Sequence, residues 1–593
     1  MTAPEPTARS EGRIVKDAIE ALRARAQYLQ SWQHLYKWSV LAGLTGLFGG
    51  LAAVAFVWLL ETLDGLGTAA IDALPAPWLL PVVPALGGVI VGLMRTRWAP
   101  DTLASPGATD RAIDAIHHDG GRIRPATPFI TMVTSAVTLA SGGSAGREGP
   151  TVLIGAGIGS ITAKLVDRLG LPGRLSFTCT ADDRRTLAIC GIAAGLGAVF
   201  RAPIGSALFA VSVLYIYGME YDQLMPALVS SLTSFLIFSL FFGFEPMFYA
   251  PTAWEFHVFD LAVVLTISVA ASVVGILYIR VFYGTFAWFQ RLTVPAWLKP
   301  GLGGLALGLL ALLVPGVLGM GYGAIQDAID YRIGASLLLV LVAGKILATS
   351  LTIGSGGAGG DMAPSLFIGA MLGGLIGSAA IRLFPAAPAH PELYVIAGMG
   401  AVYASVGKAP LATAILLCES TRNFTLILPL VIANTAASMA SGNHTIYESQ
   451  RASATRDQQD VLKRVPVERI YTRDAVTASA DLSAIGLLRL IGSTGHHGFP
   501  VLDADGRFVG VVSWKDAKKV PYAEREHTRV ADVMTTEPIT VVPSDQSRLA
   551  LNLIERHGIG RVVVVDPEDA GRVLGVVTQQ DLIKAYAGFV PAD

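Results

Sequence analysis

The stretch GSAGREGPTVLIGA at residues 143–156 recurs as GAGGDMAPSLFIGA at residues 357–370. In this alignment Gly146 matches Gly360, and each copy is a glycine-rich turn, a proline and an apolar helix. Such a turn leaves free backbone N–H groups at a helix N-terminus, where they can bind an anion. Two of these turns in a membrane protein predict an anion pathway built where broken helices meet.

The composition indicates a membrane protein. Of 593 residues 52% are hydrophobic and only 15% are charged, with a mean hydropathy of +0.54, whereas soluble chains carry about 25% charged residues. Five stretches approach the ~20 residues that span a bilayer, namely 38–60, 223–244, 261–279, 300–326 and 362–381. The shorter apolar stretches predict half-helices or tilted helices, which need cover from the protein; they are 150–164, 333–344 and 393–407.

Net charge and cysteine content give no indication of a nucleic-acid partner, a disulfide framework or a metal site. The net charge of −1 gives no indication of a nucleic-acid partner. The three cysteines show no motif spacing, so we expect neither a disulfide framework nor a metal site. The N-terminus lacks an early apolar core and carries basic residues up to Lys37, which predicts a cytoplasmic N-terminus rather than a cleaved signal.

The chain divides into three parts. Residues 1–37 form a polar, cytoplasmic N-terminal segment, residues 38–447 the membrane domain, and residues 448–593 a soluble tail, whose first part, 448–465, is a linker. Arg201-Ala-Pro matches Lys408-Ala-Pro. The membrane domain therefore consists of two homologous halves, about 38–243 and 258–447. The residues alone leave open whether these halves are parallel or inverted.

The tail also repeats. GVVSWKD at residues 510–516 matches GVVTQQD at residues 575–581, and each copy follows an apolar strand and precedes a helix. We expect two small α/β modules, at 466–520 and 528–590, that pack as a pair.

These motifs resemble the CLC family of chloride channels and chloride/proton antiporters, followed by a tandem CBS pair. GREGP at 146–150 is the family's G(K/R)EGP segment, GDMAP at 360–364 is similar to GxFxP, and IYESQ at 446–450 is similar to the segment with the central-site tyrosine. The resemblance implies an all-α polytopic membrane protein with an inverted-repeat fold and broken helices, plus a cytoplasmic α/β tandem CBS domain.

It also implies a non-enzymatic homodimer with one pore in each subunit, embedded in lipid, with inorganic anions (chloride, and nitrate) as substrates. No cofactor is required. Both termini would be cytoplasmic, and we expect the membrane to be the plasma membrane.

Chloride is large and singly charged, so backbone N–H groups, helix dipoles and hydroxyls can hold it without a full positive charge. The hydroxyl of Tyr447 would add a donor, although this residue could also be an interfacial belt tyrosine. The arginine side chain of the first turn is expected to pair with an acid elsewhere rather than to contact the anion. The predicted backbone donors belong to Gly146, Arg147, Gly149, Gly360, Asp361, Met362 and Ala363.

Glu148 is the predicted gate. A carboxylate inside an anion site can occupy that site itself, and protonation would release it. The alternative is a glutamate that only caps a helix start. Because an ionisable residue at membrane depth costs about 2.5–3.5 kcal/mol, the gating role is the better interpretation.

Two positions depart from the family pattern in ways that bear on transport. Where the family has a coordinating serine before the glycine, this chain has Pro106 before Gly107, or Ser105 if the loop shifts by one residue. Proline has neither hydroxyl nor N–H, and in the family it accompanies a nitrate preference. The internal proton-glutamate position is Val213, preceded by Ser212. Valine cannot relay a proton, so we expect a passive channel; an antiporter that uses water or another acid remains the alternative.

Two departures lie in the second glycine-rich turn. Asp361 stands where the family has an apolar residue, and a carboxylate that faced the anion would repel it; we expect it instead to point to solvent and cap the helix. Met362 replaces a pore-side phenylalanine, so this constriction should be more adaptable.

The CBS pair suggests an adenine nucleotide, with Ser513 or Thr578 bound to phosphate or ribose and Asp516 or Asp581 bound to the ribose hydroxyls. A nucleotide-free dimerisation module is the alternative. Two rival classes are remote: an intramembrane protease, whose glycine motifs are incomplete here, and a divalent-cation channel, which would need clustered acids.

Overall fold

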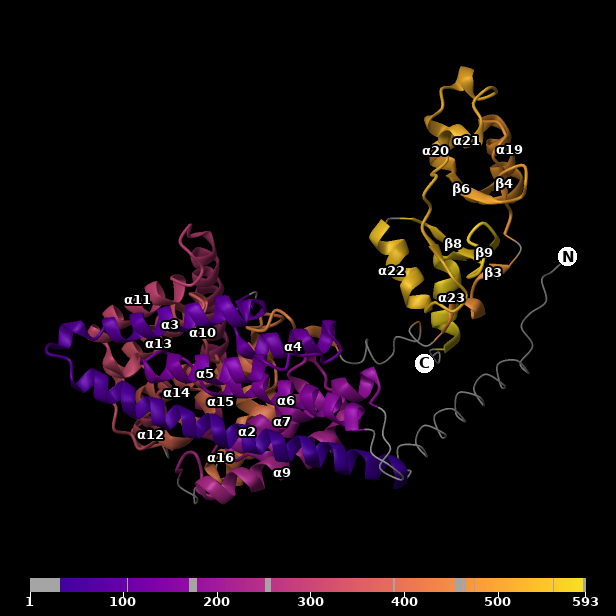
Figure 1. Cartoon of the computed structure of the whole chain (residues 1–593). Helices are drawn as coiled ribbons and strands as arrows, with labels where there is room; N and C mark the ends of the chain where they lie inside the picture. The colour runs from indigo at the N-terminus through magenta and orange to yellow at the C-terminus, as the bar shows by residue number, and fades with distance from the viewer. Residues whose placement is uncertain are drawn as a thin grey trace. The chain divides into compact units, whose positions relative to one another are not determined.

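A computed structural model gives the fold (Figure 1). It describes residues 32–103, 105–169, 179–250, 257–387, 390–453, 462, 465–473, 475–557 and 559–589. The chain separates into a membrane unit of residues 29–454 and a C-terminal unit from residue 455. Each is described by itself.

The membrane unit is helical, and its helices fall into two series that follow the repeat. The first series is α2 (Trp32–Asp72), α3 (Val82–Trp98), α4 (Ala108–His118), α5 (Thr127–Ala140), α6 (Glu148–Leu169), α7 (Ala181–Phe200), α8 (Pro203–Ser212) and α9 (Leu224–Phe242). The second is α10 (Val258–Arg291), α11 (Lys299–Leu313), α12 (Tyr322–Ile329), α13 (Ala335–Gly354), α14 (Met362–Leu383), α15 (Pro391–Gly407), α16 (Pro410–Thr421) and α17 (Ile427–Ala440). Strands β1 (Tyr215–Tyr217) and β2 (Arg451–Ser453) pair in parallel after α8 and before the C-terminal unit.

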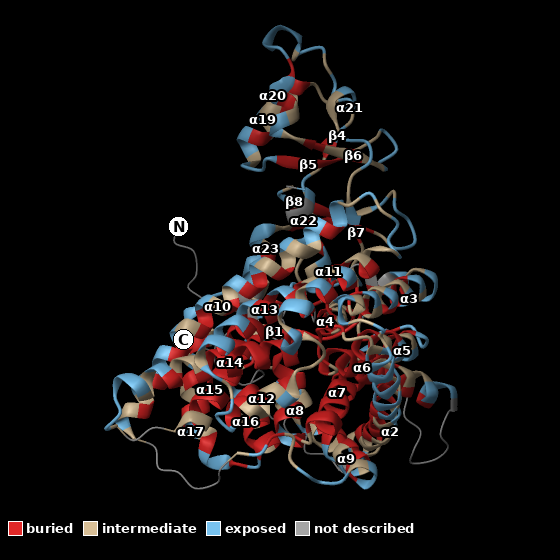
Figure 2. Cartoon of the chain, turned by 90° about the vertical axis from the view of Figure 1, so that its left-hand side faces the viewer, coloured by how far each residue is buried: buried red, intermediate tan, exposed pale blue. Residues whose placement is uncertain are grey.

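Matched glycines hold the centre of each series together. A side chain on Gly155 of α6 would overlap the carbonyl oxygen of Gly191 on α7, and the same overlap arises between Gly369 of α14 and Gly398 of α15. Small residues let helix backbones approach this closely. The four helices therefore form the buried centre of the unit, which is red in Figure 2.

The breaks between helices repeat as well. Arg201 ends α7 and Lys408 ends α15, both in the left-handed conformation with φ of 53° and 60°. A proline then begins the next helix, where its missing N–H costs nothing. Arg201 donates to the carbonyl of Phe242 at the end of α9, and Lys408 donates to that of Ser438 near the end of α17. Each basic side chain thus satisfies a helix C-terminus of its own half.

The structure corrects the predicted spans. The stretch 300–326 is not one span, because Pro315 ends α11 and positive φ angles at Gly319 and Gly321 precede the short α12. Of the two interpretations of 333–344, the half-helix does not hold: α13 continues through Lys345, whose ammonium donates to main-chain carbonyls instead of ending the helix.

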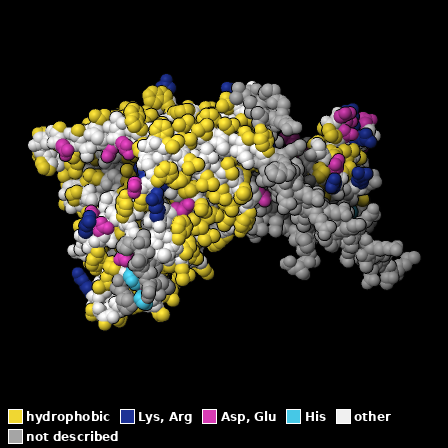
Figure 3. All heavy atoms as spheres, turned by 90° about the horizontal axis from the view of Figure 1, so that it is seen from below, with side chains coloured by type: hydrophobic (Ala, Val, Ile, Leu, Met, Phe, Trp, Pro, Cys, Tyr) yellow, Lys and Arg dark blue, Asp and Glu magenta, His cyan; other side chains and the backbone are white. Residues whose placement is uncertain are grey.

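The half-helix interpretation does not hold at 150–164 either, because α6 is 22 residues long. A further apolar segment, Pro77–Trp98, is long enough to span. In all, seven of the described helices are long and apolar enough to cross a bilayer, and hydrophobic side chains cover much of the visible surface (Figure 3).

The C-terminal unit contains two three-stranded patterns of the same order. The first is β4 (Ala478–Ser479), α19 (Ala484–Thr494), β5 (Gly498–Leu502), β6 (Phe508–Ser513) and α20 (Trp514–Lys519); the second is β7 (Thr540–Val541), α22 (Ser547–His557), β8 (Arg561–Val565), β9 (Val573–Thr578) and α23 (Gln579–Phe589). In both patterns the first strand pairs in parallel with the second, and the second pairs antiparallel with the third. Strand β3 (Thr472–Arg473) extends the second sheet, and α21 (Val530–Val533) lies between the patterns. Arg561 donates to the carbonyl of Gly498 at 2.7 Å and joins the two modules.

Candidate functional site

The two glycine-rich turns meet at one point inside the membrane unit. The amide of Gly146 donates to the carbonyl of Gly360 at 2.7 Å, and the amide of Gly360 donates to the carbonyl of Gly146 at 2.8 Å. This antiparallel bridge joins equivalent residues of the two repeats, which is what a two-fold axis between inverted halves requires. The N-termini of α6 and α14 therefore lie next to each other.

Glu148 is the first residue of α6 and is fully buried. Its Oε2 lies in the space that a side chain on Gly146 would fill, and that space is 3.1 Å from the amide nitrogen of Ala363 at the start of α14. The amides of Glu148 and Ala363 point at the carboxylate, although Oε2 has no partner that meets hydrogen-bond geometry. The carboxylate thus lies between the two helix N-termini, where an anion would be stabilised.

Tyr322 holds this carboxylate in place. Its hydroxyl donates to Oε1 of Glu148, and it is the first residue of α12, directly after Gly321 in the left-handed conformation. Arg147 stacks over the Tyr322 ring at 5.4 Å. Among the described residues Arg147 forms no ion pair, contrary to expectation, and the ring of Tyr322 is its neighbour instead. Glu148 and Glu61 interact with the Arg147 guanidinium only through charge.

Asp361 does not point to solvent, contrary to the sequence-based expectation. It is the N-cap residue of α14, but its side chain makes no capping bond and is only 2% exposed. The Tyr447 hydroxyl faces its carboxylate and also lies 3.1 Å from the hydroxyl of Tyr403. Tyr278 of α10 and Tyr403 of α15 are close enough for their hydroxyl groups to interact electrostatically with Asp361, so its side chain faces these helices and not solvent. Tyr447 is 1% exposed, so it is not an interfacial belt residue.

The loop before α4 forms the next wall. A side chain on Gly107 would lie 3.9 Å from Oδ1 of Asp361, so this loop approaches the same carboxylate. Pro106 is buried, and the Ser105 hydroxyl donates to Asp110 at 2.7 Å. Asp110 also accepts from the amide of Ser449 at 2.9 Å. The one hydroxyl of this loop segment is therefore engaged within the protein.

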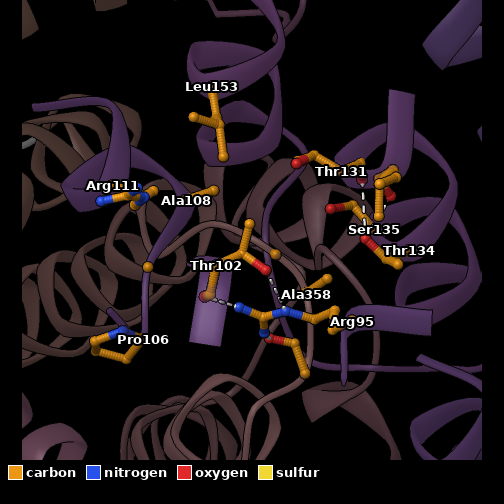
Figure 4. Close-up of a pocket in the computed structure, with 14 residues that line it drawn as sticks. Arg95, Thr102, Pro106, Ala108, Arg111, Thr131, Thr134, Ser135, Leu153 and Ala358 are labelled. Atoms are coloured by element: carbon orange, nitrogen blue, oxygen red, sulfur yellow. Dashed lines mark hydrogen bonds between the residues drawn. The ribbon is translucent and has the colours of Figure 1, made fainter. Parts of the chain in front are cut away.

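Arg95 ties this loop to the second glycine-rich turn. Its guanidinium donates to the carbonyls of Gly356 and Gly357 at 2.6 and 3.1 Å and to the Thr102 hydroxyl at 3.2 Å. Figure 4 shows it beside Thr102, with Thr131, Thr134 and Ser135 grouped on α5 nearby. The enclosed pocket measures about 20 Å³, which is room for one water molecule.

The internal proton-site position carries no acid, and Ser212 lines a pocket of about 470 Å³. Ser212 ends α8 and donates to the carbonyl of Leu208 at 2.6 Å. Val213 is fully buried, and its carbonyl accepts from the Gln450 amide at 2.8 Å. The buried acid next to this helix end is Glu220, whose amide donates to the Val211 carbonyl at 3.0 Å and whose carboxylate is held by Arg185 and Tyr215.

The structure therefore brings most of the predicted anion-site residues to one place. Met362 is buried at the start of α14, as are Asp361 and Ala363 on either side of it. Sequence reasoning missed Tyr322, Arg95 and Asp110, which come from three different elements. The sequence held one signal for Tyr322, the Gly-Tyr-Gly run at 321–323, because paired glycines mark a turn that can approach another backbone.

The C-terminal unit holds a cavity of about 860 Å³ between its two modules. Ser513 and Asp516 line it, together with basic residues, His497, Lys515, His557 and Arg561. Thr578 and Asp581 are not among its lining residues. Both carboxylates cap helices: Asp516 accepts from the Ser513 hydroxyl and Asp581 from the Thr578 hydroxyl, each at 2.7 Å.

Comparison with known proteins places the chain among anion-transport proteins. A family model described as "Voltage gated chloride channel" matches residues 87–442, and the CBS domain model matches residues 467–522 and 530–588. A putative chloride channel protein ClcB-like from Ralstonia nicotianae is 32% identical over 440 residues, which are 72% of this chain and 98% of that protein. The voltage-gated ClC-type chloride channel ClcB from Escherichia coli (strain SMS-3-5 / SECEC) is 30% identical over 62% of this chain and 84% of its own length.

Solved structures show the same architecture. A slow cyanobacterial Cl⁻/H⁺ antiporter superposes with a TM-score of 0.61 and 25% identity, covering 69% of this chain and 96% of that one. A CLC-type fluoride/proton antiporter gives a TM-score of 0.59 and 25% identity over 72% and 100%. A eukaryotic CLC transporter covers 93% of this chain and 99% of its own, with a TM-score of 0.60 at 19% identity. The predicted fold class, helical inverted repeats followed by a CBS pair, is confirmed.

Proposed function

The chain belongs to the voltage gated chloride channel family of CLC-type anion transporters and carries two CBS domains, and we propose that it conducts chloride passively through a pathway gated by Glu148. The observation that carries this proposal is the Glu148 carboxylate, buried between the N-termini of α6 and α14. A carboxylate there competes with chloride for the same amides. Protonation or a high chloride concentration would therefore open the path.

Val213 supports a channel rather than a proton-coupled exchanger. It is a fully buried valine at the position where a second, internal acid would accept a proton. The nearby Glu220 is held by Arg185 and Tyr215, which ties up both of its oxygens. A proton would therefore have no free carboxylate at this end of α8.

Proton-coupled antiport is the second candidate. It is favoured by Asp361, a buried carboxylate directly after the second glycine of the bridge. Two of the structures that this chain resembles are of proton antiporters. Here the acid would lie in the anion path itself rather than at the end of α8.

A flux assay in reconstituted vesicles separates these candidates. Chloride and nitrate efflux would be measured for the wild type and for Glu148→Gln, with the proton flux recorded at the same time. Passive conduction predicts that Glu148→Gln raises chloride efflux and that a chloride gradient moves no protons. Uphill proton movement in the wild type would overturn the channel and establish the antiporter, and absence of anion flux from both proteins would overturn both.

For the C-terminal unit we propose an adenine nucleotide in the cavity between the modules. Its volume suits a mononucleotide, Ser513 and Asp516 present hydroxyl and carboxylate groups to a ribose, and Lys515 and Arg561 present charge to phosphates. Thr578 and Asp581 take no part in this proposal, since they do not line the cavity. Calorimetric titration of the full chain with ATP tests it, and no heat of binding would contradict it.

Two further expectations rest on the family. We propose a homodimer with a pathway in each subunit, and an orientation in the plasma membrane with both termini cytoplasmic, supported by the basic residues before α2. Mass measurement of the detergent-solubilised protein checks the first. Labelling of a cysteine introduced in the C-terminal unit, in intact and opened cells, checks the second.

A further inference from the structure

Two buried acids differ from all the others in the described part of the chain. Six acidic residues are buried there: Asp110, Glu148, Asp183, Glu220, Asp260 and Asp361. Four of them have a hydrogen-bond partner for each oxygen. Only Oε2 of Glu148 and Oδ2 of Asp361 have none. A buried carboxylate oxygen without a partner is costly, so each of these two needs a ligand, a proton or a functional reason.

These two acids flank the glycine bridge. Glu148 follows the first bridge glycine by two residues, and Asp361 directly follows the second. Glu148 lies with the amide of Ala363 and the Tyr322 hydroxyl. Asp361 lies instead with the Tyr447 hydroxyl and the Gly107 loop. Each carboxylate is therefore surrounded by groups suited to hold a monovalent anion.

We propose that Asp361 is a second gate, whose ionised carboxylate occupies the anion position between Tyr447 and Gly107 and must be protonated before an anion can enter there. The inference rests on the proposed function and adds a second acid to the same pathway. Glu148 alone would make opening depend on one protonation event; with Asp361, an anion crosses only when both positions are neutral or displaced.

The charges around Asp361 favour this behaviour. The groups that act on it electrostatically are Asp110 on α4, Glu148 on α6, and the hydroxyls of Tyr278, Tyr283, Tyr403 and Tyr447. None of these is a cation. The cation that α13 presents to α14 is Lys345, but its ammonium lies over Phe367 at 4.9 Å and donates to the carbonyls of Val317 and Gly319. An anion beside an ionised Asp361 would therefore meet uncompensated like charge.

The test removes the first gate and then titrates the second. In the Glu148→Gln background, chloride efflux from vesicles is measured at symmetrical pH between about 4.5 and 7.5, because the neutral fraction of a carboxyl group falls about tenfold for each pH unit above its pKa. We expect the efflux of Glu148→Gln to fall by about tenfold or more over this range. The double variant Glu148→Gln/Asp361→Asn should conduct equally at both ends and exceed Glu148→Gln at pH ~7.5 by the same factor.

A gain of flux cannot come from misfolding, so the expected result is unambiguous. Asp110→Asn in the same background is the matched control: it removes a neighbouring buried charge whose oxygens are both engaged, by Ser105 and Ser449, and the pH dependence should remain. A pH-independent Glu148→Gln flux, or a pH dependence that survives Asp361→Asn, would overturn the second gate alone. No flux from Glu148→Gln at any pH would overturn the proposed function with it.

Discussion

Tyr322→Phe should weaken the hold of the protein on the Glu148 carboxylate, the proposed first gate. The substitution removes one hydroxyl, the donor to Oε1 of Glu148, and keeps the ring over which Arg147 stacks at 5.4 Å. A hydrogen bond to a charged group contributes about 1.5–3 kcal/mol, and each ~1.4 kcal/mol is a factor of ten in an equilibrium constant. The equilibrium constant for occupation of the anion site by the Glu148 carboxylate should therefore fall about 10- to 150-fold.

The measurement is the chloride concentration that gives half-maximal efflux from reconstituted vesicles. Chloride and the carboxylate compete for the same amides, so Tyr322→Phe should lower this concentration by a factor within that range. The control is the same substitution in the Glu148→Gln background, where no charged carboxylate remains and the shift should vanish. An unchanged half-maximal concentration, or an equal shift in both backgrounds, would refute the reasoning.

Three other changes give distinct outcomes. Gly360→Ala should destabilise the membrane unit by about 2–4 kcal/mol, because its Cβ would lie 2.5 Å from the amide nitrogen and 2.7 Å from the Cα of Gly149; thermal unfolding in detergent checks this, and an unchanged midpoint would contradict it. Pro106→Ser should raise the chloride-over-nitrate permeability ratio about fivefold, because one hydrogen bond of ~1 kcal/mol corresponds to that factor. Reversal potentials measure the ratio, and an unchanged ratio would contradict the idea that a missing hydroxyl donor lowers chloride selectivity. Asp516→Ala should weaken adenine nucleotide binding about tenfold, whereas Asp581→Ala, which removes the equivalent helix cap outside the cavity, should leave it unchanged in calorimetry; equal losses would argue against the site.

The sequence was sufficient for the repeat and for the position of Glu148. Glycine and proline at matched positions report directly on backbone turns, so the meeting of the two helix N-termini and the burial of Glu148 could be anticipated. The order of the two halves could not be derived from the residues themselves and came from the family resemblance. The structure shows it in the antiparallel bridge between Gly146 and Gly360, which are far apart in the chain.

The direction of side chains was the harder part. Asp361 at a helix start looked like an exposed cap, and only the enclosure of its turn by other helices shows that it faces Tyr447. Lys345 looked like the end of an apolar stretch, yet its ammonium donates hydrogen bonds to the carbonyls of Val317 and Gly319, which follow the break after α11. The partners of both side chains come from segments that are distant in the sequence, and local helix propensity contains no information about those partners.

The bridge between Gly146 and Gly360 also bears on how the protein is made. One strand of the bridge belongs to the first half of the chain and the other to the second, so the ribosome must deliver α14 before the bridge can close. Contacts of such long sequence separation carry a loop-closure entropy that slows folding. A site that needs both helix N-termini is therefore incomplete while only the first half of the chain is inserted.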